Sequence, residues 1–575
     1  MVAWSLKPRP QAAPAASSVT RLVVGPPAGD RVTIDAGAIA LSPDGRRLAY
    51  VAGRGSRQQI YLREFDQFES RAVPGTEGGY NPFLSPDGQW LGFFAGGKLK
   101  KVLPGVGEPV TICDALIGSG TPAWEADDTI YFTPVIGAGI MRVSASGGKP
   151  MPVTSLASDE NAHQWPQLLP GSKTLLFSAV GAAGPQIYLQ SLETGQRRRV
   201  FQGLGARYLP SGHLVFIQGG TVMAVPFDLA SLETSGMPVP VLSGVLQANR
   251  LRSTAVSNLL PQISYANAGD ALAFVPSSTG RRRSELVWVD SSSVERPTGA
   301  SGGDYFQPRL SPDGRRVAVV GGDHDDVWLF DLSRQTWNRF TSEGNNSFPL
   351  WAPDGTRLVY VSDRAGVENM YTRPVGGSVD ERLLVSTRAT YPLSMARDGT
   401  LAFVSVRLGQ AQDIWVLHPD QKDKPTPWLE TPFSEGGAAF APDGRWLAYV
   451  SNESGRNEVY VRPHPGPGEK ITISTDGANE PLWAPDGRQL FYRSGDAVFA
   501  VDIQTTSTLS AGKPRKLFEK DYERTSTLWP NYDVGPHGRQ FLMIKTLEDQ
   551  APAQINVVLN WVDELKRRVP VSRRE

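Results

Sequence analysis

The segment Ser-Pro-Asp-Gly, or a near copy of it, recurs about every 43 residues over long stretches of this chain of 575 residues. A fixed period of this length is typical of a fold built from stacked supersecondary units. The repeat is therefore the feature that most restricts the possible folds. The six clear copies are Ser42–Gly45, Ser85–Gly88, Ser311–Gly314, Ala352–Gly355, Ala441–Gly444 and Ala484–Gly487.

Each copy has the composition of a tight turn between two strands. Proline presets the backbone at the second turn position, aspartate tolerates the third, and glycine supplies a positive φ at the exit. Around Ser85–Gly88 the turn stands between the apolar runs Pro82–Leu84 and Trp90–Phe94, and Leu99–Leu103 follows. This pattern predicts a hairpin whose type I turn closes with a glycine bulge. Two further short runs complete the period, so each repeat predicts one four-stranded blade of a β-propeller.

Six weaker copies keep the turn residues and the apolar run that follows them. They are Glu125–Asp128, Leu169–Ser172, Pro210–His213, Asn267–Asp270, Ala396–Gly399 and Gly535–Gly538. Twelve copies exceed the four to eight blades that one propeller normally holds. The sequence therefore predicts an all-β fold of two consecutive six-bladed propellers, separated near residues 277–284, where small and basic residues are typical of a linker.

The expected domain order follows from this count. It comprises a flexible Pro/Ala-rich tether at residues 1–19, a first propeller at 20–280, a second propeller at 284–568 and a basic tail at 569–575.

Ring closure is predicted from the strands that the repeats leave over. We expect Thr20–Val24 to close the first ring and Glu285–Val289 to close the second, because an uncovered sheet edge invites aggregation. The last blade is expected to take further strands at 531–534, 540–544 and 555–561. Residues 284–575 would then fold alone.

Composition excludes several classes of partner. Lys+Arg and Asp+Glu both number 58, so no net charge attracts the chain to nucleic acid or to a membrane surface. No apolar run approaches the 18 residues of a spanning helix, so direct membrane insertion is not expected. Met1–Lys7 lacks the pattern of a secretory signal, and the chain by itself therefore predicts no compartment. A single cysteine, Cys113, excludes an intrachain disulfide.

Several segments go beyond a generic repeat. They are Ala162–Gly171, Ala206–Leu214, Ala224–Asp228, Leu286–Asp290, Val327–Leu332, Ser451–Gly455 and Ile555–Trp561. In this order they resemble the TolB/WD40-like (PD40) propeller region that follows the kinase domain and membrane helix of many bacterial serine/threonine kinases. The resemblance covers residues 20 to about 570. The chain has no Gly-rich phosphate loop, His-Arg-Asp or Asp-Phe-Gly motif, so kinase activity does not carry over.

The resemblance implies a non-enzymatic binding, sensing or scaffold module, similar to the extracytoplasmic part of such a kinase receptor. A membrane-anchored kinase is then a candidate partner. A protein, peptide or small-molecule ligand is expected at the propeller funnels, where loops converge. Two alternatives stay open: a TolB-like adaptor in an envelope protein complex, and a propeller that gates a peptidase or hydrolase whose catalytic part lies elsewhere.

Possible catalytic and metal motifs are better explained as turns. Gly299–Gly303 matches Gly-x-Ser-x-Gly around Ser301, but no α/β-hydrolase pattern follows it. Asp323–Asp326 clusters metal-capable side chains on one short loop, where they seldom converge on an ion. The six histidines lack metal-ligand spacing, and we interpret each as a turn or rim residue. No catalytic, cofactor-binding or metal site is predicted, and no cofactor.

The repeated aspartates and tryptophans also have structural interpretations. Each aspartate is expected to cap its own turn. Most tryptophans near the turns should pack between blades, and one or two should line a central funnel. These tryptophans are Trp90, Trp124, Trp165, Trp351, Trp446 and Trp483.

Overall fold

The computed structural model describes most of the chain between residues 18 and 571. The residues between these limits that it does not describe are 35–36, 55–56, 116–119, 135–137, 158–159, 182–183, 250–258, 267–269, 278–283, 323–324, 366–367, 385, 387–388, 407–411, 422–423, 467, 506–507, 525–528 and 548–553.

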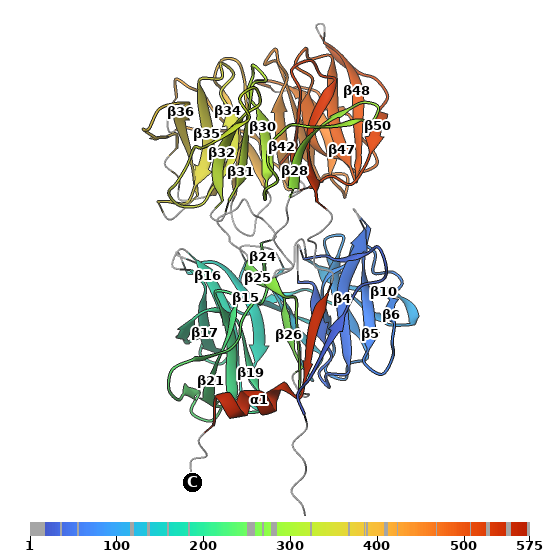
Figure 1. Ribbon diagram of the computed structural model, residues 1–575, viewed down its shortest axis with the longest axis vertical. Helices are drawn as coiled ribbons and strands as arrows, with labels where there is room; N and C mark the ends of the chain where they lie inside the picture. Colours follow the sequence, from blue (N-terminus) through green and yellow to red (C-terminus); the bar gives the residue numbers. More distant parts are fainter. Residues whose placement is uncertain are drawn as a thin grey trace, which may run out of the picture.

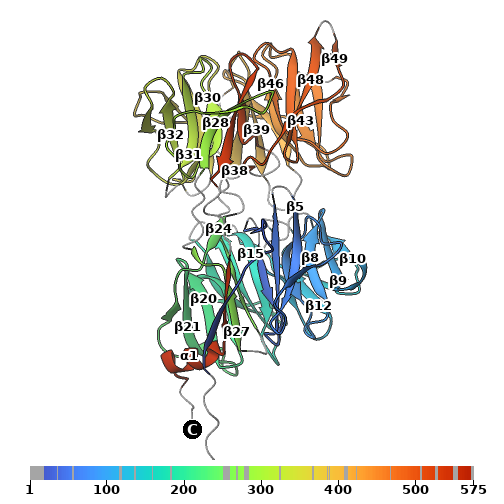
Figure 2. The ribbon, with the colours of Figure 1, turned by 45° about the vertical axis from the view of Figure 1, so that its right-hand side comes forward.

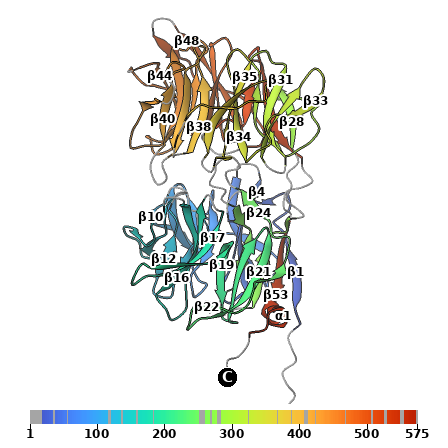
Figure 3. The ribbon, with the colours of Figure 1, turned by 90° about the vertical axis from the view of Figure 1, so that its left-hand side faces the viewer.

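The described residues form twelve antiparallel blades arranged as two rings of six (Figure 1). The predicted all-β fold of two six-bladed propellers is confirmed. Figures 2 and 3 show the same two rings, one above the other, after turns of 45° and 90°. Nine blades have four strands and three have five.

The first ring begins with four blades in chain order, each given from its innermost strand outward. The first contains β3 (Ile39–Leu41), β4 (Arg47–Arg54), β5 (Arg57–Glu64) and β6 (Ser70–Ala72), with β2 (Arg31–Val32) also beside β4. The second contains β7 (Tyr80–Leu84), β8 (Leu91–Ala95), β9 (Lys98–Leu103) and β10 (Val106–Asp114). The third contains β11 (Ala123–Trp124), β12 (Thr129–Phe132), β13 (Met141–Ser144) and β14 (Met151–Pro152). The fourth contains β15 (Glu160–Leu168), β16 (Thr174–Gly181), β17 (Gln186–Ser191) and β18 (Arg197–Gln202).

The first ring ends with two less regular blades. The fifth contains β19 (Leu204–Leu209), β20 (His213–Gln218), β21 (Thr221–Asp228), β22 (Glu233–Thr234) and β23 (Val239–Leu242). The sixth contains β26 (Ile263–Tyr265), β27 (Ala271–Phe274), β53 (Ile555–Leu559) and β1 (Thr20–Val24). A separate hairpin between these blades contains β24 (Gln247–Asn249) and β25 (Leu259–Pro261).

The second ring follows the same plan. Its first blade contains β30 (Phe306–Leu310), β31 (Arg316–Gly321), β32 (Asp326–Asp331) and β33 (Thr336–Arg339). The second contains β34 (Asn346–Trp351), β35 (Arg357–Ser362), β36 (Asn369–Pro374) and β37 (Glu381–Arg382). The third contains β38 (Ala389–Met395), β39 (Leu401–Val406), β40 (Asp413–Leu417) and β41 (Thr426–Leu429). The fourth contains β42 (Glu435–Phe440), β43 (Trp446–Ser451), β44 (Glu458–Pro463) and β45 (Ile471–Thr472). The fifth contains β46 (Asn479–Trp483), β47 (Gln489–Ser494), β48 (Ala497–Thr505), β49 (Leu509–Ala511) and β50 (Arg515–Glu519). The last contains β51 (Tyr532–Val534), β52 (Gln540–Thr546), β28 (Ser284–Asp290) and β29 (Glu295–Pro297).

The repeated turns have the predicted geometry. Gly45 has a φ of 72°, and its N–H donates to the Ser42 carbonyl oxygen at 2.9 Å. The Asp44 carboxylate accepts the Ser42 hydroxyl at 2.5 Å and the Arg46 N–H at 3.1 Å. The carboxylate of each repeated aspartate accepts the N–H two residues further along, which confirms the capping role. These aspartates are Asp44, Asp87, Asp313, Asp354, Asp398, Asp443 and Asp486.

The first ring is closed by strands from both ends of the chain. β53 lies between β1 and β27. It pairs with β1 in antiparallel register, from Thr20 opposite Leu559 to Val24 opposite Ile555. Thr20–Val24 therefore closes the first ring as predicted. The assignment of residues 555–561 to the second ring, and of that domain to 284–568, is wrong. The reason is that β27 and β1 each have an edge that only β53 covers.

The second ring is closed by its own chain. β28 pairs with β52 over seven residues, and β29 takes the outer position, so the predicted role of Glu285–Val289 is confirmed. The Glu295 carboxylate adds contacts to Lys545 at 2.8 Å and to Lys520 at 2.7 Å, and accepts the Tyr522 hydroxyl at 2.7 Å. In chain order, the complete second ring is thus inserted between two neighbouring strands of the first ring, β27 and β53.

Both rings tie their last blade to their first with the same hydrogen bonds. In the first ring the Ala38 N–H donates to Gln262 at 2.8 Å, across 224 residues. In the second ring the Gln307 N–H donates to Asn531 at 2.7 Å, also across 224 residues. The identical separation indicates that the two rings have equivalent blades at equivalent positions.

The turn faces of the two rings point away from each other. In the first ring, Ala271 at the turn end of β27 pairs with Leu559, next to α1 (Trp561–Arg568), which lies at the end of the molecule remote from the second ring (Figure 1). In the second ring, β28 begins at Ser284, on the side nearer the first ring. Its last residue, Asp290, pairs with Gln540 at the end that is remote from the first ring. The predicted helical end is confirmed as α1, and its Trp561 and Leu565 are buried on the first ring. None of the helical segments in the described ranges is long and apolar enough for a bilayer crossing.

The turn glycines allow a matched stability test. Gly314 and Gly355 have φ values of 68° and 69°, so alanine at either position costs about 1–2 kcal/mol of backbone energy. A Cβ at Gly314 would lie 2.4 Å from Cγ of Pro536, whereas at Gly355 the nearest atom, Cδ of Pro312, is 3.6 Å away. We expect Gly314→Ala to destabilise the second ring more than Gly355→Ala, as measured by urea unfolding. Equal losses would show that the contact with Pro536 carries no strain.

The insertion predicts how the chain responds to truncation. Deleting residues 548–575 removes β53 and α1, so the first ring should lose its cooperative thermal transition while the second ring keeps its own. Calorimetry of the full chain, of this deletion and of the fragment 284–546 measures both transitions. The fragment serves as the control, because β28 and β52 close it without β53. An unchanged first-ring transition in the deletion would contradict the closure by β53.

Candidate functional site

A β-bulge in the innermost strands controls which side chains reach the ring centre. In seven of these strands the register shifts at a residue with positive φ, four positions before the turn begins. Bulges of this kind redirect the residues that follow them. The bulge residues are Asn81, Trp165, Gly205, Gln307, Phe348, Gly437 and Glu480.

The side chains of several bulge residues join neighbouring blades, which offsets the strain of a positive φ in a non-glycine residue. Gln307 accepts the Phe348 N–H at 2.7 Å, and Glu480 accepts the Asn531 N–H at 2.9 Å. Two positions after each bulge, the chain places another residue near the ring axis. In the first ring these residues include Phe83, Gln167 and Arg207.

The centre of the first ring encloses a cavity of about 340 Å³. Residues from all six blades line it, so it is the funnel of the propeller. Turn prolines lie at one end of the cavity, on the turn face that points away from the second ring. These prolines are Pro43, Pro86, Pro170 and Pro210.

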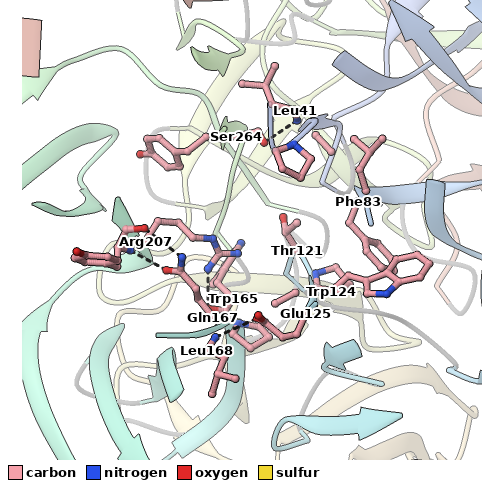
Figure 4. Close-up of a pocket in the computed structure, with 18 of the residues that line it drawn as sticks. Leu41, Phe83, Thr121, Trp124, Glu125, Trp165, Gln167, Leu168, Arg207 and Ser264 are labelled. Atoms are coloured by element: carbon pink, nitrogen blue, oxygen red, sulfur yellow. Dashed lines mark hydrogen bonds between the residues drawn. The ribbon is translucent and has the colours of Figure 1, made fainter. Parts of the chain in front are cut away.

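One side of the funnel is aromatic. Phe83 and Trp124 meet at tilted rings with centroids 6.0 Å apart, and Trp165 also lines the cavity. Figure 4 shows Phe83 and Trp124 on one side, and Arg207, Gln167 and Trp165 on the other. The prediction that one or two tryptophans line a funnel is confirmed by Trp124 and Trp165. An apolar wall with a few polar groups is typical of a ligand site.

Arg207 provides the positive charge of the funnel. Its Nη1 donates to the carbonyl oxygens of Trp165 at 3.0 Å and of Ala206 at 3.1 Å. Burial lowers the pKa of this guanidinium to about 10, against the attraction of Tyr265 and Glu125. The side chain therefore stays charged at neutral pH.

Glu125 provides a carboxylate in the same funnel. Its Oε1 accepts the Leu168 N–H at 3.4 Å. Burial raises the pKa of Glu125, an effect that the Leu168 hydrogen bond and the charge of Arg207 oppose. The funnel thus combines one cation, Arg207, and one carboxyl group, Glu125, whose pKa is raised, in a lining with both polar and apolar surface.

Gln167 orients the polar side of the funnel. Its Oε1 accepts the Tyr208 N–H at 2.7 Å, and its Nε2 donates to the Tyr208 carbonyl at 3.2 Å. Ser264 accepts the Leu41 N–H at 2.9 Å in the closing blade. These side chains belong to the scaffold and also face the funnel, so their positions depend on the ring being closed.

Sequence reasoning did not identify the polar funnel residues. Gln167, Arg207 and Ser264 each stand two positions before a residue that takes the place of Ser85 in its turn, at Leu169, Leu209 and Ala266. Leu209 and Ala266 directly precede the weak copies that begin at Pro210 and Asn267. The same offset from the clear copy at Ser85 gives Phe83. The repeat therefore contains the signal, because strand alternation and the bulge place this offset at the ring axis.

The structure brings none of the rejected motifs into a catalytic site. Ser301 is exposed, and its carbonyl oxygen accepts the Tyr305 hydroxyl at 2.6 Å. Asp323 and His324 lie outside the described residues. Asp326 is buried, and its carboxylate accepts Arg339 and the Thr341 hydroxyl, so it stabilises its own blade. Among the described residues, no group of three or more His, Cys, Asp or Glu side chains is placed to hold a metal ion.

The prediction that every histidine lies on a turn or rim is wrong for His163. This residue is fully buried in β15, where Nδ1 lies 2.7 Å from the Thr154 hydroxyl and Nε2 lies 3.0 Å from Glu160. Burial lowers the pKa of His163. The polar contacts with Thr154 and Glu160 inside the blade allow His163 to be buried. The spacing of the turns in the sequence did not indicate this burial.

Comparisons with known proteins agree with this architecture. The family described as TolB beta propeller domain (PD40) matches residues 246–426. This segment, which is less than half of the chain, is similar to a TolB-type propeller domain. The match runs from the end of the first ring into the third blade of the second, so it crosses the junction between the rings.

Similar curated proteins cover only part of this chain. The "Uncharacterized peptidase YuxL" of Bacillus subtilis (strain 168) is 26% identical over 227 residues, which are 37% of this chain and 31% of that protein. The Tol-Pal system protein TolB of Francisella tularensis subsp. tularensis is 23% identical over 246 residues, 41% of this chain and 56% of that protein. The chain thus spans less than two thirds of the length of these relatives.

Similar solved structures include TolB from Acinetobacter baumannii, with 15% identity and a TM-score of 0.33 over 69% of this chain and 81% of that chain. The tricorn protease has 12% identity and a TM-score of 0.30 over 83% of this chain and 58% of that chain.

A second buried carboxylate gives a pH prediction. Glu435 begins β42, where its Oε1 accepts the Thr431 hydroxyl at 2.7 Å and the Ser451 hydroxyl at 3.1 Å. Burial raises the pKa of Glu435 to about 7. The folded state therefore holds a proton that the unfolded state releases near pH 4.5, and stability should fall as pH rises from about 4.5 to 7.

Glu435→Gln should remove this loss. We expect the melting temperature of the variant to match that of the parent at pH 5 and to exceed it by about 2–4 °C at pH 8. In a domain of this size, that shift corresponds to a gain of about 1 kcal/mol in the free energy of unfolding. Glu295→Gln is the control of opposite sign, because its lysine and tyrosine partners overcome burial and lower the pKa of Glu295 to about 2. It should destabilise the second ring at both pH values. A pH-independent gain in Glu435→Gln would contradict the assignment.

Proposed function

We propose that this chain is a non-catalytic binding module whose ligand site is the funnel of the first ring. The observation that carries the proposal is the cavity lined by all six blades, with an aromatic wall and few polar groups. Such a site recognises a ligand by shape and by one or two charged contacts. The turn face at one end of the funnel points away from the second ring.

The partner is proposed to be an envelope protein or a ligand presented there. The support is the TolB-type domain and the similarity to a protein named for the Tol-Pal system. An extracytoplasmic location belongs to the same proposal. A sensor role beside a membrane-anchored kinase, which the sequence resemblance implies, is its more specific form.

A second candidate function is the gating of a peptidase. The similarity to a relative named as a peptidase favours it, and the chain spans 31% of that protein. In this case the catalytic residues lie in another protein or segment. A fluorophosphonate probe should leave Ser301 unlabelled, because no described histidine or carboxylate forms a hydrogen bond with its hydroxyl. Labelling that Ser301→Ala abolishes would contradict the non-catalytic reading.

The funnel is tested by blocking it. Thr121 is half-buried in the lining, so Thr121→Trp should fill part of the cavity. We expect the variant to lose at least about tenfold in capture of its partner from envelope fractions, with an unchanged melting temperature. Phe68→Ala is the matched control, because Phe68 is an aromatic residue that is 99% exposed outside the funnel. Equal capture by the parent and Thr121→Trp would show that partners bind elsewhere.

A further inference from the structure

Arg207 has one edge with no protein partner. Its Nη1 is held by the carbonyl oxygens of Trp165 and Ala206, which fix the plane of the guanidinium. No described residue accepts a hydrogen bond from Nε or Nη2. These two N–H groups are parallel and match the two oxygens of one carboxylate.

An arginine at the same offset from its turn, in the first blade of the second ring, is used differently. Arg309 also stands two positions before its turn, which begins at Ser311. Its Nη1 donates to Pro308 at 2.7 Å and to Tyr532 at 3.2 Å, and its Nη2 donates to Pro530 at 3.0 Å. Both of its terminal nitrogens therefore serve ring closure. The free edge of Arg207 is not a general property of this position.

Tyr265 also contributes to the lining, but its ring packs against Trp561 and its hydroxyl is buried, with no hydrogen-bond partner among the described residues. A ligand in the funnel does not reach this hydroxyl, so the charged donors of the site are those of Arg207.

The charges of the funnel limit the ligand. One arginine matches one negative charge, and the Glu125 carboxylate disfavours a more highly charged anion such as phosphate. Phe83, Trp124 and the turn prolines form an apolar surface for the rest of the ligand. A cavity of about 340 Å³ lies at the small end of ligand sites.

We propose that the funnel of the first ring binds a monocarboxylate with an apolar body, whose oxygens accept hydrogen bonds from Nε and Nη2 of Arg207. The inference rests on the proposed function of the funnel as a ligand site. The carboxylate belongs to a small free acid or to the C-terminus of a peptide, since both present the same two oxygens.

Calorimetric titration of the full chain with paired probes tests this. The probes are 3-phenylpropionate against 3-phenylpropanol, and N-acetyl-Gly-Phe with a free C-terminus against its amide. We expect at least one acid to bind, and its neutral partner to bind about ten- to a hundredfold more weakly, as hydrogen bonds to a charged group imply. The pair that shows this difference identifies the source of the carboxylate.

Variants assign the contacts. Arg207→Gln should weaken the acid by the same factor and leave the neutral probe unchanged, whereas Arg199→Gln, on the exposed outer strand β18, should change neither. Arg207→Lys keeps the positive charge but lacks the two parallel N–H groups, so acid binding should fall about tenfold while the neutral probe is unchanged. This variant keeps the test valid if Arg207→Gln fails to fold.

The outcomes separate the two proposals. Equal binding of acid and neutral probes, or an unchanged acid affinity in Arg207→Lys and Arg207→Gln, would overturn the carboxylate and leave the funnel as a ligand site. Absence of binding by any acid would also overturn it. The capture experiment with Thr121→Trp then decides on the funnel separately.

Discussion

The pairing of β53 between β1 and β27 is the constraint on which the first ring depends. A propeller blade without its outer strands has unpaired N–H and C=O groups along an edge, and only another strand satisfies them. Here that strand comes from the far end of the chain, after the complete second ring. The second ring closes on itself through β28 and β52. The first ring, and the funnel within it, therefore require both ends of the chain.

Closure also determines the chemistry of the funnel. Its lining comes from six innermost strands, and each bulge directs a residue toward the axis. Gln262 and Ser264 bond to the first blade only when the ring is closed. A site of this kind is rigid, and a rigid site loses little entropy when a ligand binds.

The two rings share one architecture but give an arginine at the same offset different hydrogen-bond partners. Their closing hydrogen bonds have the same sequence separations, and both place an arginine at the same offset from a turn. In the second ring the arginine is bonded to three carbonyl oxygens and lies near Asp533. In the first ring, Nε and Nη2 of Arg207 have no hydrogen-bond partner among the described residues. The neighbours of the two arginines differ, because Arg309 lies in the first blade of its ring and Arg207 lies in the fifth.

The sequence alone determined the blade count, the turn geometry, the aspartate caps and two closing strands. These features are local, because proline, aspartate and glycine act on the turn that contains them. The tertiary structure decided the place of residues 555–559, the burial of His163 and the grouping of Arg207 with Tyr265. Each of these depends on contacts between residues far apart in the chain. A strand pattern shows that β53 is a strand, but its partners are chosen by which edges remain open once both rings have formed.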